Sequence, residues 1–171
     1  MPDPLKSKLE FEVPFEVPFE VFQTLTLAAL SGVRSSVPPA LLAGSIRRGE
    51  TGNLEGTPFE KLGLAAGVLS VLMAGEMLAD KTSLIPARTS AGPAAGRAVS
   101  GALVGATLFT AAGRGSGPGA LAGGASAIVG LYAADRARKW ASESAGIPDP
   151  LWGVLEDALT LGVSRSLLGN R

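Results

Sequence analysis

The sequence has 171 residues, of which 46% are hydrophobic and only 5% aromatic, and its 15 basic and 15 acidic residues give a formal net charge of zero. The balanced charge excludes the global basic field that attracts nucleic acid, so no nucleic-acid partner is predicted. Cysteine and histidine are absent, which excludes disulfides, thiolate ligands and the commonest general base. No catalytic residue, metal or cofactor is predicted, and the chain is not expected to be an enzyme.

The composition is apolar through small side chains, since the chain has 23 glycines, abundant alanine and only 18% charged residues. A soluble core normally buries larger side chains. Helices that pack in lipid use small residues, because close backbone approach replaces the hydrophobic driving force. We therefore predict an all-α, polytopic membrane helical bundle of about five short spans over residues 21–171, after an N-terminal arm over residues 1–20. A soluble Ala/Gly-rich bundle is the alternative.

The arm contains the repeat FEVPFEVPFEV over residues 11–21, with Pro and Phe each recurring every fourth residue. Pro14 and Pro18 each lack a backbone donor, so a regular helix through both is not expected. The segment is either a flexible lead-in or an arm whose phenylalanines lie in the membrane interface.

The first predicted span covers residues 21–46 and is broken near Ser31–Pro39. A proline pair interrupts the hydrogen-bond ladder, and an arginine is costly at membrane depth. Such a break is tolerated where it faces protein or a water-filled cavity. The alternative is two short helices with the arginine at the surface. The residues of the predicted break are Gly32, Arg34, Ser35, Ser36, Pro38 and Pro39.

A polar loop over residues 47–61 leads to a second predicted span over residues 59–81. Glu76 and Asp80 lie in its apolar stretch, four residues apart and therefore on one helix face. After a polar hinge, the third span covers residues 93–113. Its glycines have the G-x-x-x-G spacing that allows close helix approach, at Gly101 and Gly105.

A glycine-rich turn over residues 113–119 precedes the fourth predicted span, residues 119–140. Small residues recur there every fourth position from Gly119 and Gly123, and aromatic residues follow near the far end, as is typical of a membrane interface. The fifth span covers residues 151–168 and carries Glu156, Asp157 and Arg165.

Two internal sequence similarities predict a duplicated hairpin. Ala79–Lys81 and Ala134–Arg136 place an Ala-Asp-basic sequence at the ends of the second and fourth spans. The first and fifth spans share an arginine beside serine in a Gly-Val context. A parallel repeat accounts for both similarities, and chance similarity in Ala/Gly-rich sequence is the alternative.

The same residues carry a resemblance to a known family. Gly32–Arg34 gives a Gly-x-Arg in the first span, Ala79–Lys81 an Ala-Asp-Lys helix end, and Pro93–Arg97 the start of the next span. In these features the chain resembles the small bacterial membrane proteins of the domain of unknown function four thousand one hundred and twenty-six, over residues 22–168. It departs at Arg97, which follows the proline instead of preceding it. The resemblance implies a membrane location and no particular activity.

Ionisable residues inside spans are functional candidates, because each is costly in lipid unless it is paired. They predict a charged network in a small solute or ion transporter or channel, with Arg34 at the broken helix binding an anionic group and Glu76 as a protonatable gate. The alternative is a non-transporting scaffold or accessory subunit in which the charges are structural. The network candidates are Arg34, Glu76, Asp80, Arg97, Asp135, Glu156, Asp157 and Arg165.

The predicted partners are the lipid bilayer, a small anionic solute or ion, and further copies of the chain in a homo-oligomer. More basic residues fall on the side of the N-terminus than on the other side of five spans, which favours a cytoplasmic N-terminus. With the resemblance, this predicts a multi-pass protein of the bacterial inner membrane.

Overall fold

The computed structural model describes residues 17–79, 89–144 and 146–169, and over these residues the chain is helical and has no strand. The predicted all-α class is therefore confirmed. The elements in chain order are α1 (Phe19–Val33), α2 (Val37–Arg47), the 3-10 helix η2 (Pro58–Ala65), α3 (Ala66–Ala79), α4 (Ala91–Ala111), α5 (Ser116–Ser144) and α6 (Asp149–Gly169).

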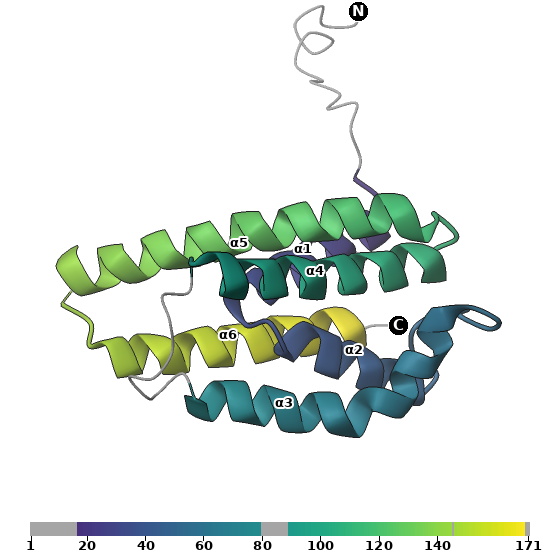
Figure 1. Cartoon of the computed structure of the whole chain (residues 1–171), viewed down its shortest axis with the longest axis horizontal. Coiled ribbons are helices and arrows are strands. Elements are labelled where there is room, and N and C mark those ends of the chain that lie inside the picture. Colours follow the sequence, from purple (N-terminus) through teal and green to yellow (C-terminus); the bar gives the residue numbers. More distant parts are fainter. Residues whose placement is uncertain (1–16, 80–88, 145, 170–171) are drawn as a thin grey trace, which may run out of the picture.

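The helices form two layers (Figure 1). α1, α4 and α5 pack against one another in the first layer, and α2 contacts α3 and α6 in the second. The chain passes from the first layer to the second between α1 and α2, at Arg34–Ser36. This crossing point lies near the middle of the molecule, so residues there can contact both layers.

Glycines set the spacing of the first layer. A Cβ atom added at Gly101, Gly105, Gly119 or Gly123 would lie under 3.0 Å from the backbone of the facing helix, α5 or α4. Gly32 of α1 has the same relation to the backbone of α5. Backbone approach this close requires residues without a side chain, as in helix pairs that associate in lipid. The structure thus places all four predicted packing glycines at one helix–helix contact.

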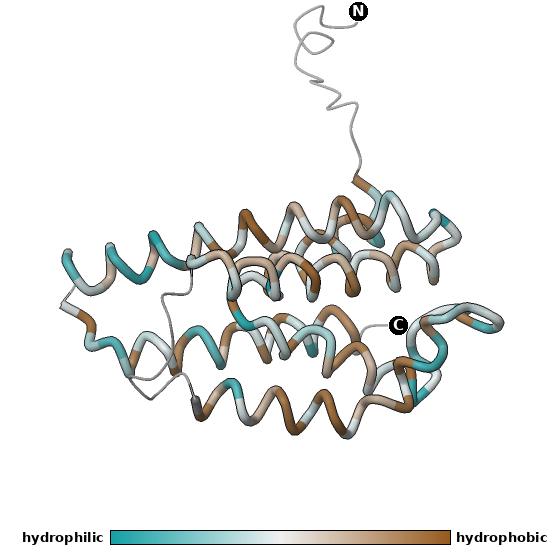
Figure 2. Tube along the Cα trace, viewed as in Figure 1, coloured by the Kyte–Doolittle hydropathy of each residue, from teal (hydrophilic) through white to brown (hydrophobic). Residues whose placement is uncertain are grey.

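Large apolar side chains are divided between a small core and the outer surface. Leu27, Leu42 and Leu108 belong to a buried cluster that joins the two layers. The outward apolar side chains are most pronounced on η2 and α3, where Leu64 is 87% and Val71 is 72% exposed. Figure 2 shows these hydrophobic turns along α3, at the outer edge of the second layer. This outward apolar face is what a helix in contact with lipid or with a partner presents.

Two stretches are long and apolar enough to cross a membrane, Pro58–Leu78 and Ala91–Ala111. Each has 21 residues. At a rise of 1.5 Å per residue, the α-helix Ala91–Ala111 is about 30 Å long, the thickness of the hydrocarbon core. The two stretches correspond to the second and third predicted spans. Within the described residues, α1 is a shorter apolar helix, so the count of about five spans stays a prediction.

Several boundaries differ from the predicted ones. α1 begins at Phe19, within the predicted arm, whose residues 1–16 lie outside the described residues. The turn predicted over 113–119 is shorter, because α5 begins at Ser116. Pro118 is then in the first turn of a helix, where proline removes no intrahelical hydrogen bond.

Candidate functional site

The helix is interrupted within the predicted stretch Ser31–Pro39, and the interruption between α1 and α2 is three residues long. Arg34 leaves the helical region with φ −133° and ψ 105° and ends α1. α2 then starts at Val37, with Pro38 and Pro39 in its first turn. These prolines lack the N–H groups that would continue the hydrogen-bond ladder of α1, but they fit the start of a new helix. The sequence therefore both ends one helix and begins the next.

The carboxylate of Glu76, in α3, caps the beginning of α2. Its Oε1 accepts hydrogen bonds from the backbone N–H of Ser35 (3.0 Å) and from the Ser35 hydroxyl (2.8 Å). Its Oε2 accepts from the backbone N–H of Ser36 (2.8 Å) and from the Ser36 hydroxyl. The Ser36 side chain does not cap α2 itself. An anion from another helix thus occupies the partially positive N-terminus of α2.

The opposite side of the break is tied to α4. The hydroxyl of Ser100 donates a hydrogen bond to the backbone carbonyl of Ser35. Ser100 lies one residue before Gly101, one of the glycines at the close contact of α4 with α5. The break is therefore bonded to α3 through Glu76 and to α4 through Ser100.

Arg34 points into α6 and is only 2% exposed. Its Nε lies 2.7 Å from Oδ1 of Asp157, and its Nη2 lies 3.9 Å from Oε2 of Glu156. Nη2 also donates to the carbonyl of Gly153 at 3.3 Å. A buried arginine requires such pairing, because an uncompensated charge in a low dielectric is strongly destabilising. This geometry excludes the alternative in which Arg34 lies at the surface.

Glu156 extends the cluster to α5. Its Oε2 lies 2.6 Å from Nη2 of Arg138, and its Oε1 accepts a hydrogen bond from the indole N–H of Trp152 at 2.9 Å. Arg138 also lies 3.6 Å from Asp149 at the start of α6. We call Arg34, Arg138, Glu156 and Asp157 the charge cluster. It connects the end of α1, the C-terminal part of α5 and the first half of α6.

The structure brings some predicted network residues together and leaves others apart. Arg34, Glu76, Glu156 and Asp157 meet around the break, whereas Asp135 pairs with exposed Lys139 one turn along α5, at 2.7 Å. The inclusion of Asp135 in a central network was therefore wrong.

Arg165 is also misplaced in the prediction, because its side chain is exposed near the end of α6. The two arginines of the predicted repeat, Arg34 and Arg165, therefore differ in their surroundings, since Arg34 is buried and Arg165 is exposed. Arg97 is buried in α4, where its Nη1 donates to the carbonyl of Pro93 at 3.3 Å. Asp80 lies outside the described residues.

Three members of the site were not predicted. Ser100 is one of many serines, and its role depends on where α4 lies. Arg138 lies beside other basic residues and Trp152 in an apolar helix, so neither residue stands out in the sequence. The spacing of Trp152 and Glu156, four residues apart on one face, is the signal that could have linked that pair.

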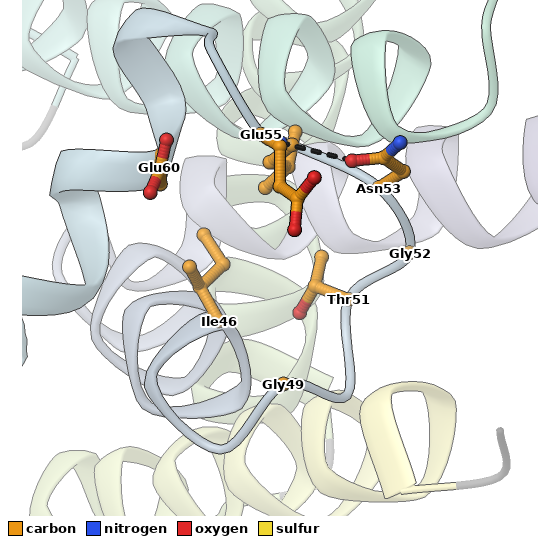
Figure 3. Close-up of a pocket in the computed structure, with 8 residues that line it drawn as sticks. Ile46, Gly49, Thr51, Gly52, Asn53, Glu55 and Glu60 are labelled. Carbon is orange, nitrogen blue, oxygen red and sulfur yellow. Dashed lines mark hydrogen bonds between the residues drawn. The ribbon is translucent and has the colours of Figure 1, made fainter.

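Two cavities are lined by residues other than Arg34, Ser35 and Ser36 of the break. The first, about 480 Å³, is formed by the loop between α2 and η2 and is lined by Ile46, Thr51, Asn53, Glu55 and Glu60 (Figure 3). In this view the Glu55 side chain points toward Thr51, while its backbone N–H donates to Asn53. Across the described segments, no three Asp or Glu side chains come together as a metal site.

The second cavity is an apolar groove of about 430 Å³ between α1, α5 and α6. Its lining comes from residues 26–33, 130–137 and 152–159. Leu155 and Leu159 line it and are 48% and 58% exposed, so the groove opens onto the molecular surface. Glu156 contributes the one carboxylate of the lining, which brings the groove next to the charge cluster.

Comparison of the chain with protein-family models, with curated proteins and with solved structures found no match. The likeness to a family of small bacterial membrane proteins therefore stays a prediction from the residues.

Proposed function

We propose that the chain is an integral membrane protein with several spans, an N-terminus in the cytoplasm and a place in the bacterial inner membrane. Two stretches of membrane-spanning length support this location, as do the leucines and valines that face outward from η2 and α3. Only 11% of the most apolar window of Pro58–Leu78 is buried inside the protein. Lipid would cover that surface at no hydrophobic cost.

Within the membrane, the protein acts as a small transporter or channel for anionic solutes or ions, with its binding site at the break between α1 and α2. The observation that carries this proposal is the anion already bound there, the Glu76 carboxylate with its four hydrogen bonds. Discontinuous helices in transporters use the same arrangement, with a half-helix N-terminus facing an anionic substrate group. A small anion would take the place of Glu76 at Ser35 and Ser36.

A non-transporting scaffold or accessory subunit is the second candidate, and a different observation favours it. The charge cluster is satisfied inside the protein and connects three helices, with Arg34 and Glu156 both buried. Charges arranged in this way can fix helix register without binding a solute. In that case the outward apolar faces would hold a partner, which should co-purify in mild detergent.

Anion flux in proteoliposomes separates the two candidates. If Glu76 competes with the transported anion, replacing it with glutamine removes the competing charge. A hydrogen bond to a charged group contributes about 1.5–3 kcal/mol, so the half-saturating concentration of chloride or acetate should fall by at least about tenfold in E76Q.

Glu143→Gln, at an exposed carboxylate near the end of α5, is the matched control and should transport as the parent does. Unchanged half-saturation in E76Q would contradict the proposed site. An absence of flux in the parent protein would favour the scaffold instead.

A further inference from the structure

We propose that the groove between α1, α5 and α6 binds one acyl chain of an anionic phospholipid, with the phosphate beside Arg136. This inference rests on the membrane location proposed above and does not depend on transport. The cavity volume of about 430 Å³ lies within the range of small-molecule sites. Its shape and charge favour this one occupant for the following reasons.

The floor of the groove on α5 is made only of small residues. They recur on one helix face at positions i, i+3, i+4 and i+7, so they leave a shallow channel along the helix. Leucines and a valine from α1 and α6 form the two walls. A long, unbranched alkyl chain fits such a surface, because it gains apolar contact along its length and needs no hydrogen-bond partner. The floor residues are Gly130, Ala133, Ala134 and Ala137.

The one carboxylate that borders the groove is engaged within the protein. Oε2 of Glu156 faces Arg138, and Oε1 accepts the hydrogen bond from Trp152. The carboxylate is thus neutralised by its own cluster, which removes the repulsion that it would exert on an approaching anionic lipid. A polar solute would find less to bind in this groove than an alkyl chain.

The end of α5 supplies the complementary charge for a phosphate. Arg136 is exposed, follows the lining residue Ala133 by three positions, and has no ion pair with any residue that the structure describes. Lys139, by contrast, is held by Asp135 at 2.7 Å. Tyr132 and Trp140 flank Arg136 at a spacing of four and are 51% and 62% exposed. Aromatic residues around an arginine are typical of the depth at which lipid headgroups lie.

Fluorescence quenching by brominated lipid tests this site, because the chain has only two tryptophans. Trp140→Phe leaves Trp152 in the groove wall as the single reporter. The W140F protein is reconstituted into phosphatidylcholine vesicles that contain a small fraction of phosphatidylglycerol or phosphatidylcholine with brominated acyl chains. Since one arginine near an anionic surface contributes about 1 kcal/mol, half-maximal quenching should need about fivefold less brominated phosphatidylglycerol than brominated phosphatidylcholine.

Two variants in the W140F background identify the groove as the binding place. Ala134→Leu fills the floor and should abolish tight quenching, whereas Ala125→Leu, at an exposed alanine of α5 outside the groove, should leave it unchanged. Arg136→Gln keeps the groove intact and should remove the preference for phosphatidylglycerol.

Each contrary result has a distinct meaning. Equal quenching in the A134L and A125L proteins would overturn the lipid site. An absence of Trp152 quenching by brominated lipid would also overturn it, and would indicate that a second copy of the chain covers the groove. Flotation of the protein with the vesicles is measured first. A protein that does not float contradicts the membrane location itself, whereas a protein that floats without specific quenching contradicts the lipid site alone.

Discussion

Replacing Arg34 with methionine is expected to destabilise the protein by about 3–5 kcal/mol, the usual cost of removing one partner from a buried ion pair. The guanidinium is 2% exposed and lies 2.7 Å from the carboxylate of Asp157, which the substitution would leave without this partner. The loss should be measured as a fall in the thermal unfolding midpoint of the protein in detergent micelles.

Two further variants make this result specific. In Arg34→Met with Asp157→Leu both buried charges are gone, so part of the stability should return. Lys139→Gln breaks an exposed pair on α5 and should change stability by about 1 kcal/mol or less. If R34M and K139Q unfolded at the same temperature, the charge cluster would not hold the break in place.

Replacing Gly105 with alanine is expected to cost about 1–3 kcal/mol or more, because the added methyl group overpacks the contact between α4 and α5. The new Cβ would lie under 3.0 Å from backbone atoms of α5 at Gly119 and Gly123, so the helices themselves must move apart. The loss is measured by comparing thermal unfolding of G105A and the parent protein in detergent. Since the chain contains no cysteine, disulfides do not affect this comparison.

Gly96→Ala is the control in the same helix and should raise the stability of the protein instead of lowering it. A Cβ at Gly96 meets nothing within 4 Å, and alanine is favoured over glycine in a helix interior by about 0.5–1 kcal/mol. A G105A protein as stable as G96A would contradict the close backbone approach of α4 and α5.

Local signals in the sequence predicted the helices and the break. Apolar runs and the proline pair after Ser36 act within a few residues of chain, so their effects can be read from the sequence. The glycines at every fourth position likewise indicated a close helix contact, because only small residues allow it. In the structure that contact joins α4 to α5.

Contacts between residues far apart in the sequence could not be predicted in the same way. Nothing near Glu76 in the sequence shows that it faces Ser35, and nothing near Arg34 shows that it faces Asp157, since each pair depends on how two layers meet. Asp135 and Arg165 have the same residue types in similar surroundings, yet Asp135 pairs with Lys139 on its own helix and Arg165 is exposed. Charge in an apolar helix thus marks candidates, while the packing of the layers decides which of them meet.

Cell fractionation with a carbonate wash of the membranes tests whether this chain is an integral membrane protein. High pH strips proteins that are held to membranes only by surface contacts. We expect the chain to stay in the washed membrane, because η2, α3 and α4 present apolar surface of bilayer length. Recovery of the chain in the soluble fraction would contradict it, and the outward leucines of η2 and α3 would then have to be covered by a protein partner.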